Sequence, residues 1–413
     1  GSFESWGYSN WNKLYLDAGI DWHGSFNGHN VSGLVLAKAS RYTMPGDSYN
    51  VASGVMGFVG RVTYNYKDRY MAEVNVGYNG TEQFARGRRF GWFPAYSIGW
   101  VPTSEKFFPE NDILTFLKIR ASYGEVGNDQ LGGNRRFYYL PNTYNLNQGG
   151  YWLGNSDGSS QNPYWVGATE GVIGNPDITW ESTEMYDVGI DATLFDKLSV
   201  TADWYYKKTH DILLTLDIPS IIGLGAPYQN AGTVRNVGWE VAVGYHNKWR
   251  DFSFGVEANL SDVVNKIIDM KGTTGGSGAI RNQEGSAINS IYGLKCVGMA
   301  RTQEEADWVN ENCPQYGVTT KPGDLIYADM DDSGTIDDKD MTIIGSTVPR
   351  YTYGVNLSFG WKGLNLSAFF QGVGNVNFFT NNTYTQPFTA SSISLSNVFT
   401  DLIGKYWSES NPD

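Results

Sequence analysis

The sequence predicts an all-β protein, a transmembrane antiparallel up-and-down β-barrel with long extracellular loops, of which this chain carries about twelve strands. Three observations predict this fold. Apolar and polar residues alternate along many segments, those segments are long, and short connections alternate with long ones. We therefore expect residues 1–413 to be part of a single barrel domain.

The alternation is strict. In residues 198–206, every second side chain is apolar or aromatic, and the others are mostly polar. Successive side chains of a strand point to opposite faces, so this pattern predicts a strand with one apolar and one polar face. The same pattern recurs in residues 14–22, 70–78, 116–123, 186–194, 239–245, 252–260, 351–359 and 364–370.

The length of these segments favours a membrane barrel over a soluble β-sandwich, which is the alternative. Ordinary strands average about five to six residues, whereas a tilted strand needs about nine to eleven to cross a bilayer. Aromatic residues also end many apolar faces, as the two lipid–water interfaces favour. Examples are Tyr70, Tyr78, Trp239, Tyr245, Tyr351 and Phe359.

The connections differ in length in a regular way. The predicted short turns are residues 66–69, 195–198, 247–251 and 361–364, and residues 102–114 have room for a short helix. The predicted long connections are residues 127–178, 209–237, 265–350 and the stretch after 374. Outer-membrane barrels have short periplasmic turns and long extracellular loops, so the alternation predicts which edge faces outward.

The polar faces of the predicted strands carry many charges. A small closed barrel fills its interior with apolar side chains, so a charged interior indicates water or a polar plug in a wide lumen. The alternative for each residue is simple solvation or pairing with a neighbour. The side chains expected to point inward are Asp17, Asp21, Arg61, Glu73, Asn75, Lys118, Arg120, Asp187, Asp191, Asp203, Glu240, Glu257 and Asn259.

Composition excludes some classes of protein. The net charge of −13 argues against nucleic-acid binding, which needs a basic surface. No apolar run is long enough for a transmembrane helix, which leaves a strand-built membrane protein possible. Cys296 and Cys313 fall in one predicted loop, where a disulfide and two free thiols are both open. The sequence contains no catalytic or phosphate-binding motif, and we expect no enzyme.

Several motifs in the same order resemble the SusC/RagA family of TonB-dependent outer-membrane transporters of Bacteroidetes-type bacteria. They are "RFGWFPAYSIGWVPTSEKFF" (89–108), "LKIRASYGEVGND" (117–129), "NPDITWESTEMYDVGIDATLFDKLSVTADWYYKKTHDILL" (175–214), "NAGTVRNVGWEVAVGY" (230–245) and residues 322–372. The resemblance implies a large plugged barrel in outer-membrane lipid. It also implies TonB-driven import of oligosaccharides or peptides, with a SusD-like surface lipoprotein as partner.

The sequence departs from that family at both ends. No plug and no TonB-contacting segment precede residue 1, and the chain stops at "YWSESNPD" where further strands are expected. Open strand edges in lipid leave backbone groups unpaired, which is costly. We therefore expect a segment of a larger transporter. A passive porin or a surface glycan-binding barrel is the alternative function.

The stretch "DMDDSGTIDDKD" (329–340), inside the long connection 265–350, matches an EF-hand calcium loop. Oxygen ligands stand at the required spacing, glycine makes the sharp turn at position six, and Ile336 at position eight is expected to point inward. The alternative is an acidic surface turn. We expect a structural Ca²⁺ site, or Mg²⁺ in its place, held by Asp329, Asp331, Ser333, Thr335, Asp337 and Asp340.

Aromatic residues in the long connections are candidates for substrate binding, because the C–H faces of sugars stack on aromatic planes. Packing between loops is the alternative for each of them. The candidates are Trp152, Tyr164, Trp165, Tyr228, Phe378, Phe379 and Tyr384.

Overall fold

The computed structural model describes residues 11–43, 51–109, 111–130, 136–140, 144–152, 164–216, 218–219, 221, 223–380, 400, 403–408 and 410–411. The chain forms two compact units. The sheet unit comprises Gly1–Val264, Ile268–Thr273 and Thr352–Gly372, and the loop unit comprises Asn265–Ile267, Thr274–Tyr351 and Val373–Asp413. Most of the predicted connection 265–350 thus folds as a unit with its own strands.

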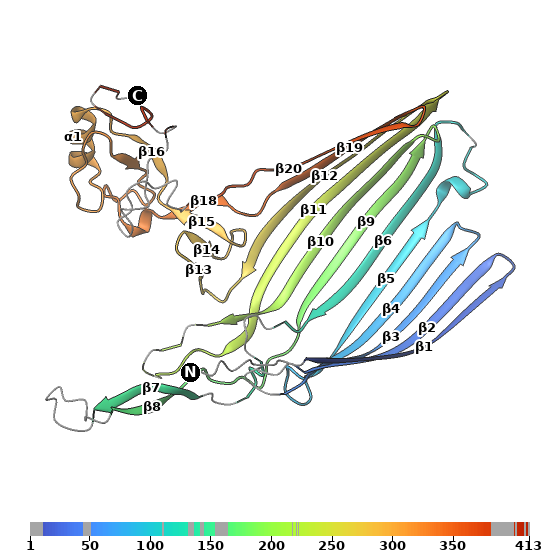
Figure 1. Cartoon of the computed structure of the whole chain (residues 1–413), viewed down its shortest axis with the longest axis horizontal. Helices are drawn as coiled ribbons and strands as arrows, with labels where there is room; N and C mark the ends of the chain where they lie inside the picture. The colour runs from blue at the N-terminus through green and yellow to red at the C-terminus, as the bar shows by residue number, and fades with distance from the viewer. Residues whose placement is uncertain are drawn as a thin grey trace, which may run out of the picture. The chain divides into compact units, whose positions relative to one another are not determined.

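The sheet unit is built on one twelve-stranded sheet, whose strands lie side by side in chain order, while shorter strands in two of the long connections lie outside it (Figure 1). This confirms the predicted up-and-down antiparallel order and the predicted strand number. The sheet order is β1 (Asn12–Phe26), β2 (His29–Thr43), β3 (Ser53–Tyr66), β4 (Tyr70–Thr81), β5 (Phe90–Trp100), β6 (Leu114–Asn128), β9 (Glu181–Leu194), β10 (Leu198–Thr215), β11 (Tyr228–Trp249), β12 (Phe252–Asp269), β19 (Tyr351–Trp361) and β20 (Leu364–Gly374).

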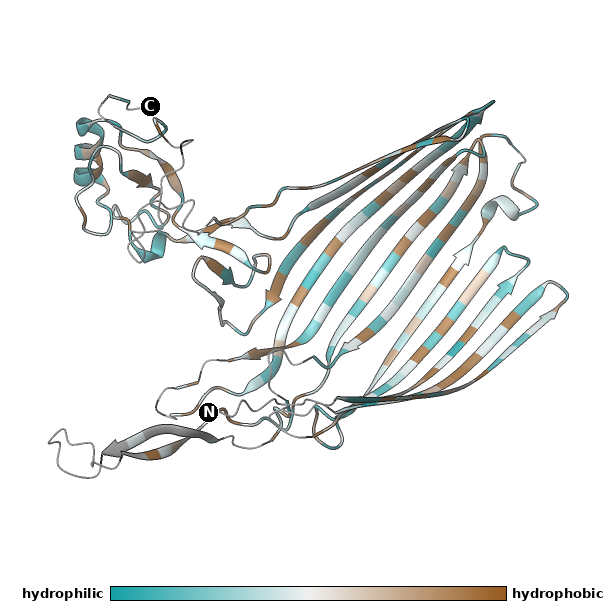
Figure 2. Cartoon of the chain, in the orientation of Figure 1, coloured by the Kyte–Doolittle hydropathy of each residue, from teal (hydrophilic) through white to brown (hydrophobic). Residues whose placement is uncertain are grey.

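Hydrophobic and hydrophilic residues alternate along the strands of this sheet (Figure 2), which places them on opposite faces as predicted. Residues opposite each other in an antiparallel pair lie on the same face. Ile190 lies opposite Ile119 on one side and Ala202 on the other, so apolar residues continue across neighbouring strands. Ile190, Val188 and Trp204 are all more than 40% exposed. An exposed apolar face of this extent belongs against lipid, and the opposite, polar face lines the lumen.

The connections follow the predicted asymmetry. Tight turns join β1 to β2, β3 to β4, β9 to β10, β11 to β12 and β19 to β20, all at one edge of the sheet (Figure 1). The turn between β5 and β6 at that edge contains the short 3-10 helix η1 (Pro102–Ser104). The long connections leave the other edge, and one of them contains the hairpin of β7 (Tyr144–Trp152) and β8 (Tyr164–Glu170).

The long connections have a core of their own. Phe84, Tyr138, Ile178 and Trp180 are buried together, although they come from two connections that are far apart in sequence. Trp180 Nε1 donates to the carbonyl of Arg89 at 3.1 Å, which joins the two connections. Apolar residues of the long connections thus pack against one another in a buried core.

The loop unit has a conventional interior. Its elements are β13 (Gly275–Ser277), β14 (Ile280–Asn282), β15 (Ser290–Gly293), β16 (Cys296–Met299), α1 (Gln303–Asn312), β17 (Leu325–Tyr327), η3 (Asp338–Asp340) and β18 (Thr342–Ser346). Ile291, Ala300, Ala306, Val309 and Ile336 are each less than 5% exposed. Cys296 and Cys313 are free thiols, which resolves the question that the sequence left open. None of the described helices is long and apolar enough to cross a membrane.

Candidate functional site

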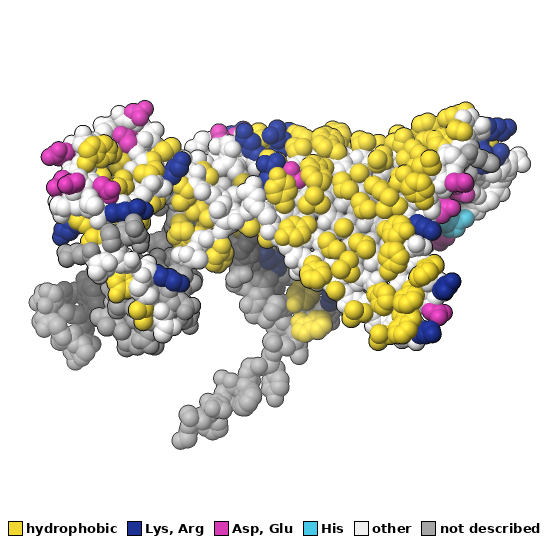
Figure 3. All heavy atoms as spheres, turned by 90° about the horizontal axis from the view of Figure 1, so that it is seen from above, with side chains coloured by type: hydrophobic (Ala, Val, Ile, Leu, Met, Phe, Trp, Pro, Cys, Tyr) yellow, Lys and Arg dark blue, Asp and Glu magenta, His cyan; other side chains and the backbone are white. Residues whose placement is uncertain are grey.

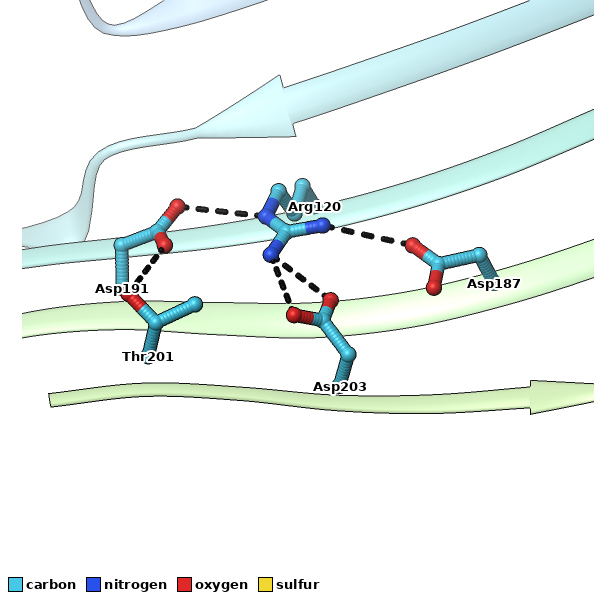
Figure 4. Close-up of polar contacts among 5 residues, drawn as sticks. All are labelled: Arg120, Asp187, Asp191, Thr201 and Asp203. Carbon is cyan, nitrogen blue, oxygen red and sulfur yellow. Dashed lines mark hydrogen bonds and ion pairs between the residues drawn. The ribbon is translucent and has the colours of Figure 1, made fainter. Parts of the chain in front are cut away.

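A charged cluster lies on the inner face of the sheet, where Arg120 of β6 faces three carboxylates (Figure 4). Its Nη1 is 3.3 Å from Asp187, its Nε is 3.2 Å from Asp191, and its Nη2 is 2.6 Å from Asp203. Thr201 Oγ1 also donates to Asp191, at 3.1 Å. One guanidinium thus holds carboxylates from two other strands.

Strand register brings these side chains together. Arg120 lies opposite Gly189 of β9, which lies opposite Asp203 of β10. A side chain at Gly189 would collide with Asp203 and with the guanidinium, so glycine leaves the space that Arg120 crosses. Asp187 and Asp191 flank Gly189 at two residues on either side, on the same face. The side chains are one-sixth to one-third exposed, and the cluster is therefore partly desolvated.

The cluster is acidic overall. One arginine faces three aspartates, and Glu240 lies opposite Asp203 in the next strand. Lys118, opposite Asp191, adds one positive charge on the same face. Beside the cluster is a hollow of about 430 Å³ whose lining is rich in hydroxyl, amide and carboxylate groups. It is lined by Thr201, Asp203, Glu240, Val241, Ala242, Asn259, Leu260, Ser261, Thr352, Tyr353, Gly354, Phe369 and Gln371.

Other residues predicted to point inward form smaller groups. Glu257 pairs with His246 at 3.1 Å, and its second oxygen accepts a long hydrogen bond from Asn356 at 3.5 Å. Glu73 accepts a hydrogen bond from Asn75, and Arg61 lies opposite Asn75 in register. Asp17 lies opposite Lys38, and Asp21 is 3.2 Å from His23. The inner face is thus a wall of paired and solvated polar groups, suited to a polar solute or a polar plug.

The predicted metal loop lies between β17 and β18 of the loop unit. Carboxylate oxygens of Asp329, Asp331 and Asp340 lie within 4.8 Å of one another. Gly334, at position six, has a φ of +77°, which glycine adopts without strain. The amides of Ser333 and Gly334 donate to Asp329 at 3.1 and 2.7 Å, so the loop is already curled around its first carboxylate.

The remaining predicted ligands divide into two groups. Ser333 Oγ donates to the Thr335 carbonyl at 2.9 Å, so these two oxygens lie together. Asp337 instead accepts from the Lys339 amide at 2.7 Å and caps η3. Its carboxylate is outside the group of three, which suits contact through a water, as is common at position nine. The hard oxygen donors that converge here fit Ca²⁺.

Backbone hydrogen bonds and burial fix the last predicted ligand, Asp340, and its part of the loop. Asp340 is fully buried and accepts from the amides of Met330 and Asp337 at 2.7 and 2.8 Å. These backbone hydrogen bonds lower the pKa of the Asp340 carboxyl, in spite of its burial. Ile336 is buried as expected, and it exchanges backbone hydrogen bonds with Pro314 and Tyr316. The loop is thus anchored to the segment that follows α1.

The candidate aromatic residues are in different surroundings. Tyr228 packs on Tyr138 with ring centroids 4.4 Å apart, beside the buried core of the long connections. Phe378 is 84% exposed and Phe379 is 42% exposed. In the hairpin β7–β8, the backbone register sets Trp152 opposite Tyr164, and Trp165 opposite Tyr151. Tyr384 lies outside the described residues.

The features that sequence reasoning missed depend on long-range contacts. The core of Phe84, Tyr138, Ile178 and Trp180 gave no periodic signal, because its members come from irregular connections. The convergence on Arg120 was also missed, although each member was expected to point inward. Alternation gives the face of a side chain but not its partner, because register across a connection of some fifty residues is set by tertiary pairing.

A family model described as "TonB dependent receptor-like, beta-barrel" matches residues 2–408. The chain belongs to this family of TonB-dependent receptor β-barrels. It is therefore part of an outer-membrane barrel, which confirms the predicted location and agrees with the resemblance to SusC and RagA.

Relatives of this TonB-dependent receptor barrel agree with the assignment. TonB-dependent receptor P26 of Formosa agariphila is 30% identical over 77% of the chain and 31% of its own length. TonB-dependent receptor SusC of Bacteroides thetaiotaomicron is 24% identical over 78% of the chain and 31% of its own length. The chain thus spans about a third of the length of the curated relatives that it matches.

Solved structures support the same fold. A chain of the RagAB peptide transporter superposes with a TM-score of 0.72 at 20% identity, over 98% of this chain and 46% of that one. The RagAB peptide importer in its open-open state gives 0.74 at 20% identity, over 98% and 45%. At this level of identity, the likeness concerns the fold of the barrel.

Proposed function

We propose that the chain forms part of the wall of an active importer that takes up oligosaccharides or peptides across the outer membrane. TonB would supply the energy, through a segment of the longer protein, and a SusD-like lipoprotein would act as the surface partner. The observation that carries the proposal is the polar inner face of the sheet, with its acidic cluster at Arg120, opposite an apolar outer face.

Two further points support this proposal over a barrel whose interior is filled by packed side chains. The inner face carries charged and hydroxyl groups along β6, β9, β10, β11 and β12, so its lumen suits water and polar solutes. Relatives named SusC and RagAB support an uptake function, and RagAB is named as a peptide transporter. Peptides and oligosaccharides share the hydrogen-bonding groups that such a wall can accommodate.

An uptake assay tests the proposal. The full-length transporter would be expressed in cells with and without TonB, and the uptake of labelled oligosaccharides and labelled peptides of similar size would be compared. We expect one class to accumulate only when TonB is present. Equal uptake in both strains would instead support a passive porin. Surface binding without uptake would support a glycan-binding barrel.

We also propose that Ca²⁺ occupies the loop 329–340 as a structural ion. The support is the convergence of the carboxylates of Asp329, Asp331 and Asp340 in a curled loop. Without a cation, three carboxylates within 4.8 Å repel one another. A bound divalent cation would offset that repulsion and stiffen the loop unit. Mg²⁺ would serve less well, because it demands a tighter octahedral set of ligands.

A further inference from the structure

Four tyrosines form a row across the outer, apolar face of the sheet. Tyr96 of β5, Tyr123 of β6, Tyr186 of β9 and Tyr206 of β10 lie opposite one another in register. Their successive ring centroids are 6.3, 4.9 and 6.3 Å apart. Tyrosine concentrates where lipid tails meet headgroups. The row therefore marks a membrane interface, on the side of the long connections.

The height of this row agrees with that interpretation. Leu198, at the short-turn edge of β10, is eight residues from Tyr206. At about 3.3 Å per residue, the apolar stretch between them is about 26 Å along the strand. Strand tilt reduces the height to about 20 Å, somewhat below the apolar band of about 25 Å that such barrels show.

A row of charged residues follows two positions beyond the tyrosines, on the same outer face. Glu125 of β6 lies opposite Glu184 of β9, Glu184 lies opposite Lys208 of β10, and Lys208 lies opposite Arg235 of β11. Two residues advance a strand by about 7 Å. The charged row therefore lies at headgroup level. Figure 3 shows that hydrophobic side chains cover the sheet and that charged side chains gather toward the ends of this band.

The acidic members of this row do not neutralise the basic ones. Glu184 turns to His210, with 3.4 Å between Oε1 and Nε2, and His210 Nδ1 is 2.8 Å from Asp211. Among the residues that the structure describes, neither Lys208 nor Arg235 has an ion pair or a side-chain hydrogen bond. The Nε of Arg235 is buried without a hydrogen-bond partner there.

Lys208 and Arg235 are thus like charges in directly opposed positions, an arrangement that destabilises a strand pair unless an anion lies between them. Phosphate suits this position, because a guanidinium binds two of its oxygens in a fork and an ammonium adds a point charge. The carboxylates of Glu125 and Glu184 lie next to Lys208 on the side of β6 and β9. They repel an anion there, so the anion is expected on the side of β10 and β11.

We propose that Lys208 and Arg235 bind the phosphate of a lipid headgroup in the outer leaflet, just above the tyrosine row. Continuity with the apolar face favours a lipid over a soluble anion, since the acyl chains of that lipid would cover the band below. The proposal rests on the outer-membrane location and is independent of the transported substrate.

Retention of lipid by the full-length transporter tests the proposal. The protein would be extracted from membranes in a mild detergent, and bound phosphate-bearing lipid would be measured by native mass spectrometry. Each basic side chain near a membrane surface contributes about a fivefold change in affinity, so K208Q/R235Q should bind about 25-fold more weakly. The matched control Lys197→Gln lies in the short turn between β9 and β10, at the opposite edge, and should retain lipid as the parent does.

The variant K208R keeps the charge and should retain the lipid, which separates loss of binding from loss of folding. R235K keeps the charge but loses the two-oxygen fork, so it should bind the lipid less tightly than the parent and more tightly than K208Q/R235Q. Unchanged retention in K208Q/R235Q would overturn the proposal. A loss of the same size in Lys197→Gln would also overturn it, because general adhesion would then explain the binding. Inorganic phosphate would be added as a competitor at millimolar concentration. If it displaced the lipid with an affinity equal to that of the lipid, Lys208 and Arg235 would be a site for a soluble anion.

Discussion

The sheet unit and the loop unit use the same kinds of residue in opposite ways. Ile190 of the sheet is 41% exposed on an apolar outer face, whereas Ile336 of the loop unit is 1% exposed inside it. Arg120 and its three aspartates lie on the inner side of the sheet, whereas the aspartates of 329–340 gather at a loop of the other unit. Burial of apolar side chains stabilises both units. Lipid covers the apolar face of the sheet, whereas the loop unit buries its apolar side chains in its own interior.

The two units are stabilised by different physical means. A sheet in lipid satisfies its backbone through strand pairing and needs no packed protein core. A unit in water must bury its apolar residues in its own interior. Exposed fractions therefore carry different meanings in the two units, and the following variants test this contrast.

The largest difference is expected from truncating equivalent isoleucines. Ile336→Ala should destabilise the loop unit by about 2–5 kcal/mol, because it leaves a cavity in a closed core. Ile190→Ala should cost less than about 1 kcal/mol in a bilayer, since lipid fills the space. Unfolding of both variants in lipid vesicles, followed by hydrogen exchange in each unit, measures the two costs. Equal costs would contradict the contrast.

A charge on the outer face is expected to have the next largest effect. Ile190→Arg places a guanidinium against lipid near mid-membrane, midway between Tyr186 and Leu194, and should cost about 2–4 kcal/mol. Ser97→Arg, on the inner face of β5, is the matched control and should cost far less, because water or polar groups meet the new charge. The measurement is urea-induced unfolding from vesicles. If both variants lost the same stability, the assignment of the two faces would be wrong.

Removing a metal ligand should affect only the loop unit. Asp331→Asn takes one charge from the group of three carboxylates and should weaken Ca²⁺ binding by about tenfold. Asp332→Asn is the control, because Asp332 lies outside that group. Calorimetry with Ca²⁺ alone gives the affinity, and proteolysis with and without chelator reports the order of the loop. No binding in the parent chain would refute the calcium proposal.

The smallest effect concerns α1, the α-helix that the structure describes in the loop unit. Thr302 accepts from the Glu305 amide at 3.3 Å and caps α1. Thr302→Ala should cost about 1 kcal/mol, and exposed Thr319→Ala should cost almost nothing. Faster hydrogen exchange confined to the amides of α1 would agree with this. A change in the exchange of the strands of the sheet would contradict the separation of the two units.

Much of the sheet could be predicted from alternation alone. The strand at 198–206, the turns at 195–198 and 361–364, and the inward position of Arg120 all follow from a period of two and from turn spacing. The convergence of Asp329, Asp331 and Asp340 could also be predicted from a motif, because these residues are close in sequence, whereas metal binding there stays a prediction. The internal strands of 265–350 were not predicted, since strands of three to five residues are too short to show a period.

The sequence by itself determined the class of protein, the strand number, the two faces of the sheet and the spacing of the acidic residues in the loop 329–340, because these depend on local order along the chain. Only the tertiary structure decided that Arg120 meets Asp187, Asp191 and Asp203, and that Lys208 stands opposite Arg235. Those contacts depend on register between strands. Register is set by pairing across the whole sheet, and a shift of one residue would have turned each partner to the other face.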